Sequence, residues 1–209
     1  MDVLLNPLTD QNVMITGLMI TGLAYLAGSI PFGMIFTRLG GKGDIRNVGS
    51  GNIGATNVLR TGSKLLAALT LIFDAGKGAL CVLIVASNFE VPLLIAIAGA
   101  ASVFGHCFPV WLKFKGGKGV ATNVAVFSAF DWRLGLIFVG LWLGSAAIMR
   151  YSSLAALIAT LGCSIAAFWL HLPAPISGAV LVMSALSWVR HHENIGRILS
   201  GTETKIGRR

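Results

Sequence analysis

Charged side chains are scarce in this sequence. Asp, Glu, Lys and Arg together make up 11% of the 209 residues, whereas soluble domains carry about 25%. Hydrophobic residues make up 55% and gather into long runs. The composition therefore excludes an ordinary soluble domain. It predicts an all-α, polytopic transmembrane helix bundle that forms one domain over residues 1–209.

Acidic side chains and cysteines are also few. The eight Asp and Glu residues do not supply the spaced carboxylates that a metal-dependent phosphatidyl-type phosphotransferase needs. The three cysteines lie in apolar stretches, which indicates small core side chains rather than a disulfide or zinc framework. We therefore expect no metal and no cofactor. The net charge of +8 comes without a nucleic-acid-binding motif, so we expect a basic membrane face and no nucleic-acid partner.

Seven apolar stretches are predicted to cross the membrane, since one crossing takes about 20 apolar residues. Pro31 and its glycine neighbours predict a kink or break near the end of the first stretch. The run 120–149 is too long for one crossing, and we divide it at Asp131 and Arg133 because charges are costly inside a bilayer. The predicted stretches are 13–37, 65–87, 91–112, 120–130, 134–149, 154–170 and 176–189.

The positions of the basic residues orient these crossings. Seven crossings place every Lys and Arg except Lys77 and Arg133 on the side that also holds the C-terminal tail. Positive residues mark the cytoplasmic side, so we expect the N-terminus outside and the C-terminus in the cytoplasm. Three polar segments then face the cytoplasm and can meet in one site. We call residues 38–63 the first island, 113–122 the second island and 190–203 the third island.

The first island contains a glycine-punctuated run of small, hydroxyl and amide residues that ends at Arg60. Glycines let backbone N–H groups converge on an anion, and hydroxyl, amide and guanidinium groups supply further donors. A flexible, hydrated connecting loop is the alternative. The predicted phosphate-binding residues are Ser50, Asn52, Thr56, Asn57 and Arg60.

The second island is a glycine-rich turn that leads into a predicted helix. Free N–H groups and the positive end of the helix dipole can bind an anion there. The spacing is not that of a Walker A loop, which argues against nucleotide hydrolysis. We predict that Lys118 binds phosphate with Gly116, Gly117 and Gly119, whereas Lys113 and Lys115 also fit a simple membrane anchor.

The third island continues the last apolar stretch. If its helix continues, His191 and Asn194 share one face, and both can bind a hydroxylated substrate. The adjacent His191 and His192 point in different directions, so a two-histidine metal site is disfavoured. A basic tail attracted to anionic lipid is the alternative, and we accept it for His192 and Arg197.

An acidic and a basic residue fall inside the predicted crossing 65–87. Asp74 and Lys77 lie three residues apart, so they can pair within the helix and support the site rather than react. His106 and Cys107 are neighbours in sequence and do not face each other on a helix, so a thiol nucleophile is disfavoured.

Taken together, the three islands resemble the bacterial acyl-phosphate-dependent glycerol-3-phosphate acyltransferases, a family of small inner-membrane proteins. The likeness lies in residues 50–57, in residues 115–122 and in residues 190–203, which end in Gly201-Thr202-Glu203. Ile53 departs from the proline common in the family, at a position that is not a polar ligand.

The resemblance implies a reaction and a location. A fatty acyl group would pass from acyl phosphate to the 1-hydroxyl of glycerol 3-phosphate, giving lysophosphatidic acid and phosphate at the cytoplasmic face of the bacterial inner membrane. Acyl-CoA would not be the donor, and an enzyme that forms acyl phosphate would be a functional partner, with membrane lipid around the chain. The residues implied in the site are Ser50, Arg60, Lys118, His191 and Asn194, with Glu203 in a structural role.

Two points stay open from the sequence. The proton of the 1-hydroxyl of glycerol 3-phosphate can go to His191 or to an oxygen of the acyl phosphate. The resemblance favours the phosphate oxygen. An organophosphate transporter would also need a basic cytoplasmic pocket. The sequence contains no convincing inverted repeat, however, and is short for such a protein.

Overall fold

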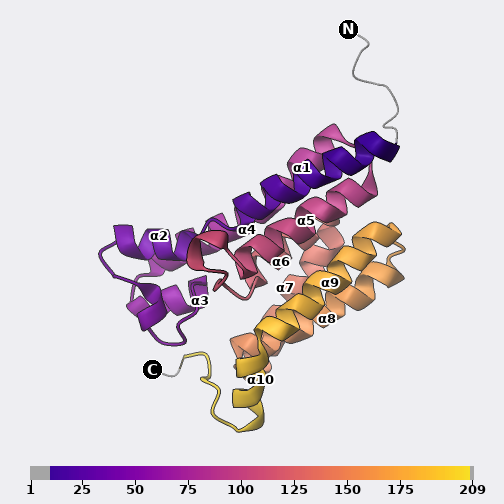
Figure 1. Cartoon of the computed structure of the whole chain (residues 1–209). Coiled ribbons are helices and arrows are strands. Elements are labelled where there is room, and N and C mark those ends of the chain that lie inside the picture. Colours follow the sequence, from indigo (N-terminus) through magenta and orange to yellow (C-terminus); the bar gives the residue numbers. More distant parts are fainter. Residues whose placement is uncertain (1–9, 208–209) are drawn as a thin grey trace.

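The computed structural model describes residues 10–207, and these form helices and loops with no β-strand among them (Figure 1). Five helical segments within this range are long and apolar enough to cross a membrane: Asn12–Leu39, Lys64–Asn88, Pro92–Leu112, Trp132–Met149 and Ser152–Trp169. Val120–Phe130 and Ala174–Arg190 are shorter apolar helices. The all-helical membrane architecture is therefore confirmed, whereas the crossing number and the orientation of the termini stay predictions.

The first apolar stretch is broken where the sequence predicts it. Helix α1 (Asp10–Gly28) ends three residues before Pro31-Phe32, and α2 (Phe32–Leu39) continues beyond the break. Proline at the N-cap of α2 lacks an N–H group and cannot continue the hydrogen-bond ladder of α1. The Ser29 hydroxyl and N–H both donate to the Tyr25 carbonyl, at 2.8 and 2.9 Å, and so help to close the end of α1.

The remaining long helices follow the predicted stretches closely. The run 120–149 divides at Asp131, whose carboxylate caps the second helix by accepting from the Arg133 N–H at 2.8 Å and pairs with the Arg133 guanidinium at 2.6 Å. The predicted division is thus confirmed. The elements are α4 (Lys64–Asn88), α5 (Pro92–Cys107), α6 (Val120–Phe130), α7 (Trp132–Met149), α8 (Ser152–Trp169), α9 (Ala174–Arg190) and α10 (His192–Leu199).

Small residues bring the helices close together. A Cβ added to Gly28 would lie 2.0 Å from the Ser102 carbonyl oxygen, and one added to Gly105 would lie 2.1 Å from the Tyr25 carbonyl oxygen. Only glycine allows α1 and α5 to approach in this way. Phe127 and Met183 are fully buried in the core between α4–α6 and α7–α9.

All three islands lie at the same end of the helix bundle, and α1 begins at the opposite end (Figure 1). The first island contains the short helix α3 (Ala55–Val58), flanked by the 3₁₀ turns η1 (Ile45–Asn47) and η2 (Leu59–Thr61). The turn η3 (Val110–Leu112) leads into the second island. The fold therefore gathers segments that are far apart in sequence at one end of the molecule.

Candidate active site

His191 occupies the junction between α9 and α10. The chain turns at this residue instead of continuing one helix, yet His191 and Asn194 are both buried, at 2% and 7% exposure. His191 Nδ1 lies 2.7 Å from the Ser187 carbonyl oxygen. That oxygen can only accept, so Nδ1 carries a proton, and Nε2 of the neutral ring is an acceptor.

Burial also fixes the charge of His191. It lowers the pKa of the imidazole to about 4, and the nearby Lys118 and Arg190 cations contribute to the lowering. The ring is therefore neutral at physiological pH. A neutral ring with its proton on Nδ1 can receive a proton or a hydrogen bond at Nε2, but cannot donate one there.

Asn194 links the third island to the second. Its Oδ1 accepts a hydrogen bond from Lys118 Nζ, 76 residues away in sequence. Its Nδ2 donates to Glu203 Oε1 at 2.6 Å. Because lysine can only donate and an ionised carboxylate can only accept, these two contacts fix the orientation of the amide.

Glu203 anchors this network from the C-terminal tail. It accepts from Ser153 Oγ and from Arg197 Nε, both at 2.7 Å. Burial alone would raise the pKa of Glu203, but the hydrogen bonds from Ser153, Arg197 and Asn194 lower it overall, so the carboxylate stays ionised at neutral pH. Arg197, which we interpreted as part of a basic tail attracted to anionic lipid, thus also holds Glu203 through its guanidinium.

Two glycines of the second island, Gly116 and Gly117, do not act as their sequence suggested. The N–H groups of Gly116 and Gly117 donate to the carbonyls of Cys107 and His106, at 3.2 and 3.1 Å, so they are not free to bind an anion. A Cβ on Gly117 would lie 2.1 Å from His106 Nε2. These two glycines therefore serve close packing, and the expectation that their N–H groups cradle phosphate is corrected.

Arg190 holds the same turn from the other side and was missing from the predicted site. Its Nη2 and Nε donate to the carbonyls of Gly116 and Gly117, at 3.0 and 3.2 Å. Its guanidinium lies 5.2 Å from the centroid of the Phe108 ring. Arg190 directly precedes His191, and this adjacency was the available sequence signal.

The start of α6 remains suited to an anion. Gly119 has φ +78° at the N-cap, a conformation that glycine adopts without strain. The first N–H groups of a helix have no intrahelical partner. Lys118 beside them is half-buried, and burial lowers its pKa, as does the nearby Arg197.

The first island is organised by one amide. Asn57 Oδ1 accepts from the Ser50 N–H at 3.1 Å, while Nδ2 lies 3.1, 2.8 and 2.8 Å from the carbonyls of Ile45, Val48 and Asn52. The side chain is 2% exposed. The expectation that Asn57 binds substrate is corrected, because its polar atoms hold the loop backbone.

The other predicted ligands of the first island face outward. Ser50, Thr56 and Arg60 are exposed, and Asn52 is half-buried. Leu112, the last residue of η3 and directly before the second island, packs against the cluster of Ile45, Ile53 and Val58. In residues 10–207, no hydrogen bond or ion pair joins the exposed three to Lys118 or His191. The first island is therefore joined by apolar packing to the turn that leads into the second island.

A buried ionic cluster lies within the bundle, connected to the second island. Lys77 Nζ donates to Asp74 Oδ1 at 2.7 Å and to the Ile30 carbonyl at 2.8 Å, which confirms the predicted pair. His106 Nδ1 lies 3.6 Å from the same carboxylate, and the ring of His106 packs against Gly117. His106 is thus a packing and electrostatic element, a role that the sequence did not reveal. Over the described range, no three His, Cys, Asp or Glu residues gather into a metal site.

Together, the fold and these contacts define a multi-pass helical membrane protein with a basic, hydrogen-bonded site at one end. The sequence model of the family described as glycerol-3-phosphate acyltransferase matches residues 18–201. The chain belongs to this family. A glycerol-3-phosphate acyltransferase of Caulobacter vibrioides is 53% identical over 195 residues, covering 92% of this chain and 88% of that protein. One from Jannaschia sp. is 49% identical, covering 97% and 98%.

Solved structures agree with this assignment. The crystal structure of PlsY, an integral membrane glycerol 3-phosphate acyltransferase, in its glycerol 3-phosphate form is similar with a TM-score of 0.88 at 41% identity, covering 91% of this chain and 96% of that one. The lysophosphatidic acid form gives 0.86 at 38% identity, covering 91% and 95%. The family predicted from the three islands is therefore confirmed as a PlsY-type integral membrane acyltransferase.

Proposed function

We propose that the chain transfers a fatty acyl group from acyl phosphate to the 1-hydroxyl of glycerol 3-phosphate, giving lysophosphatidic acid and inorganic phosphate, the first step of phospholipid synthesis. One observation carries the proposal: neutral His191 lies beside the Lys118–Asn194–Glu203 network at the basic end of the bundle. Relatives named glycerol-3-phosphate acyltransferase, and a neighbour solved in its glycerol 3-phosphate form, support the acceptor.

The exposed residues of the first island are assigned to the phosphate groups. Ser50, Thr56 and Arg60 offer hydroxyl and guanidinium donors on a loop that Asn57 holds in shape. Lys118 and the free N–H groups at the start of α6 bind the second anion and the developing oxyanion. Asn52 and Gly119 are assigned to backbone contacts around these groups. Two cations near two phosphates offset the repulsion between the substrates.

The reaction needs one bond made and one broken. The 1-hydroxyl oxygen bonds to the acyl carbonyl carbon, and the bond from that carbon to the phosphate oxygen breaks as phosphate leaves. The hydroxyl proton passes either to His191 Nε2 or to the departing phosphate. In the second case Nε2 accepts a hydrogen bond from the other glycerol hydroxyl, because the Nδ1–H of His191 is directed to Ser187.

The proposed setting is the bacterial cytoplasmic membrane, with one domain crossing seven times and the site facing the cytoplasm. Acyl phosphate is a reactive mixed anhydride, so we also propose functional coupling to the enzyme that forms it. In intact, sealed cells, a membrane-impermeant maleimide should label cysteine at Asn88 but not cysteine at Lys113. Labelling of both from outside would contradict this topology.

Purified protein with hexadecanoyl phosphate and glycerol 3-phosphate tests the reaction directly. We expect phosphate release only when both substrates are present, with lysophosphatidic acid formed in equal amount. His191→Ala with Asn194→Ala is the control and should be inactive. Hexadecanoyl-CoA in place of the phosphate should give no product. Uptake of glycerol 3-phosphate into liposomes without turnover would instead indicate a transporter.

A further inference from the structure

The C-terminal tail, described to residue 207, turns back from α10 toward the helix bundle (Figure 1). Gly201 has φ +70°, and its N–H donates to the Ile198 carbonyl at 3.1 Å. The next N–H, that of Thr202, donates to the Arg197 carbonyl at 2.8 Å. These two hydrogen bonds form a Schellman motif, which ends a helix and redirects the chain. The tail therefore leaves α10 in a fixed direction.

The far part of the tail is joined to the turn between α7 and α8 by two hydrogen bonds. The Ile206 N–H donates to the Arg150 carbonyl at 2.6 Å, and Arg150 Nη2 donates to the Ile206 carbonyl at 3.1 Å. We call these two bonds the clasp. Beside them, Lys205 Nζ lies 5.5 Å from the centroid of the Tyr151 ring, within cation–π range. Arg150 thus binds the tail backbone both as acceptor and as donor.

The backbone of Arg150 is strained, which separates its side chain from its place in the turn. Arg150 is the C-cap of α7 with φ +64°, in the left-handed region. Glycine adopts this conformation without strain, and helices commonly end on it. The Arg150 side chain is exposed, so it does not fill the core. What the arginine provides, and a glycine would not, is the guanidinium bond to the tail.

Glu203 lies in the tail between the Schellman motif and the clasp. Its carboxylate accepts from Ser153 at 2.7 Å and from Asn194 at 2.6 Å. The Asn194 amide in turn accepts from Lys118. Because the tail is fixed on both sides of Glu203, the carboxylate is held beside the amide. A continuous path of contacts therefore joins Arg150, outside the candidate site, to the lysine within it.

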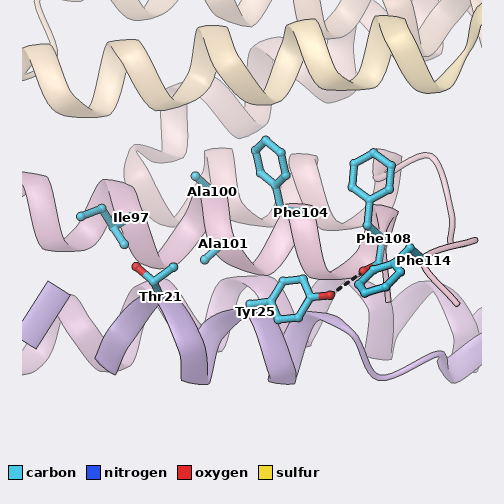
Figure 2. Close-up of a pocket in the computed structure, with 8 residues that line it drawn as sticks. All are labelled: Thr21, Tyr25, Ile97, Ala100, Ala101, Phe104, Phe108 and Phe114. Carbon is cyan, nitrogen blue, oxygen red and sulfur yellow. Dashed lines mark hydrogen bonds between the residues drawn. The ribbon is translucent and has the colours of Figure 1, made fainter. Parts of the chain in front are cut away.

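Lys118 and Asn194 are held in place by different parts of the molecule. On the Lys118 side, the Tyr25 hydroxyl donates to the Phe108 carbonyl at 2.8 Å and fixes the segment that leads into the second island (Figure 2). Arg190 then holds two carbonyls of the glycine turn. The Asn194 amide takes its orientation from the tail instead. A loosened tail should therefore disturb the amide and leave the glycine turn in place.

We propose that Arg150 is a positioning residue for acyl transfer. Its clasp on the tail holds Glu203 beside Asn194, and the oriented amide holds Lys118 at the start of α6. This inference rests on the proposed function. It adds a residue that does not touch the substrates, and it gives the tail a role in the geometry of the site.

Arg150→Gly tests this role because it removes the guanidinium and relaxes the backbone. We expect kcat to fall about five- to tenfold through misplacement of the amide, while the KM for glycerol 3-phosphate stays within about twofold because Arg60 is unaffected. The thermal midpoint should be nearly unchanged, since relief of the strain offsets the greater freedom of glycine in the unfolded chain. His171→Gly is the matched control. His171 is exposed, has φ +53° and lies on the α8–α9 turn, so kcat should not change.

Two further variants test whether Arg150 acts through the tail. Ile206→Pro removes the N–H donor from the other side of the clasp and should lower kcat about as much as Arg150→Gly. In a Glu203→Gln background, Arg150→Gly should lower kcat by less than about twofold more, because the two residues act in series. Unchanged kcat in both clasp variants would overturn the proposal. Equal losses with and without Glu203 would overturn it as well.

Hydrogen exchange gives a measurement that does not depend on turnover. A wild-type peptide that contains Glu203 and Ile206 should exchange its amides about tenfold or more slowly than the same peptide in Arg150→Gly. His171→Gly should match wild type. Equal exchange in all three proteins would show that the clasp does not hold the tail, which refutes the inference. Wild type that releases no phosphate would instead refute the proposed reaction, and the exchange rates would still decide the clasp.

Discussion

The first island and the network around Asn194, which we both propose to bind anions, are built in opposite ways. In the first island Ser50 and Arg60 are exposed, and one buried amide, Asn57, holds the loop. Around Asn194, both ends of the amide already have partners within the protein, Lys118 at Oδ1 and Glu203 at Nδ2. The first arrangement suits capture of a substrate from water, and the second suits a reaction that needs fixed geometry.

The difference matters for what substrate binding must change. Arg60 makes no ion pair among the described residues, so a phosphate reaches it without displacing a protein partner. Lys118, by contrast, already donates to Asn194. Its ammonium carries three donors, so it can hold Asn194 and still bind a phosphate oxygen. We therefore expect substitution of His191 to lower kcat and substitution of Arg60 to raise the KM for glycerol 3-phosphate.

Replacement of His191 should have the largest effect. His191→Ala is expected to lower kcat by about 10²-fold or more, because general base catalysis contributes about 10²–10⁴-fold. The Kd for glycerol 3-phosphate should change little, since Arg60 is unaffected. Steady-state rates and calorimetric binding in detergent measure the two quantities.

The variant His191→Gln distinguishes the two possible proton acceptors, His191 and the substrate phosphate. Glutamine accepts a hydrogen bond but takes no proton at working pH. Recovery of more than about a tenth of the activity in His191→Gln would assign the proton to the phosphate. Full activity in His191→Ala would refute the role of this histidine.

Arg190→Lys should have an intermediate effect. Lysine cannot reproduce the two-point hold on the carbonyls of Gly116 and Gly117. We expect kcat/KM to fall about tenfold because Lys118 loses its fixed position. Arg133→Lys is a matched control, since Arg133 also makes a two-point contact, with Asp131 on the α6–α7 turn. Equal losses in both variants would indicate general destabilisation instead.

Arg60→Ala should have the smallest effect and a different signature. We expect the KM for glycerol 3-phosphate to rise about five- to tenfold with kcat nearly unchanged, because one exposed charge-assisted contact is lost. The increase should shrink at high salt, where exposed charges are screened. Arg46→Ala is the control, since Arg46 is paired with Asp44 at 2.5 Å in the same island. A fall in kcat without a change in KM would remove the contrast between the two regions.

The helices were predictable because a bilayer imposes simple demands on sequence. A crossing needs a long apolar run, and a proline or a charged pair interrupts it. Thus the break before Phe32 and the division at Asp131 both fell where expected. The pair of Asp74 and Lys77 was also predictable, because its partners lie one helical turn apart.

The contacts that build the candidate site were not predictable in the same way. Lys118 and Asn194 are 76 residues apart, and Ser153 and Glu203 are 50 apart, so no local spacing signals either pair. Gly116 and Gly117 suggested open N–H groups, whereas both are packed closely against His106. Asn57 resembled a ligand because composition does not reveal which amide faces inward.

The hydrogen bond from Lys77 to the Ile30 carbonyl has a consequence for assembly in the bilayer. During synthesis the N-terminal parts of a chain emerge first, so the segment around Ile30 emerges before Lys77. The Lys77 ammonium can pair with Asp74 on its own helix and donate to the Ile30 carbonyl of an earlier segment. It therefore does not have to lie unpaired in hydrocarbon. The order of the segments along the chain thus suits the order of their insertion.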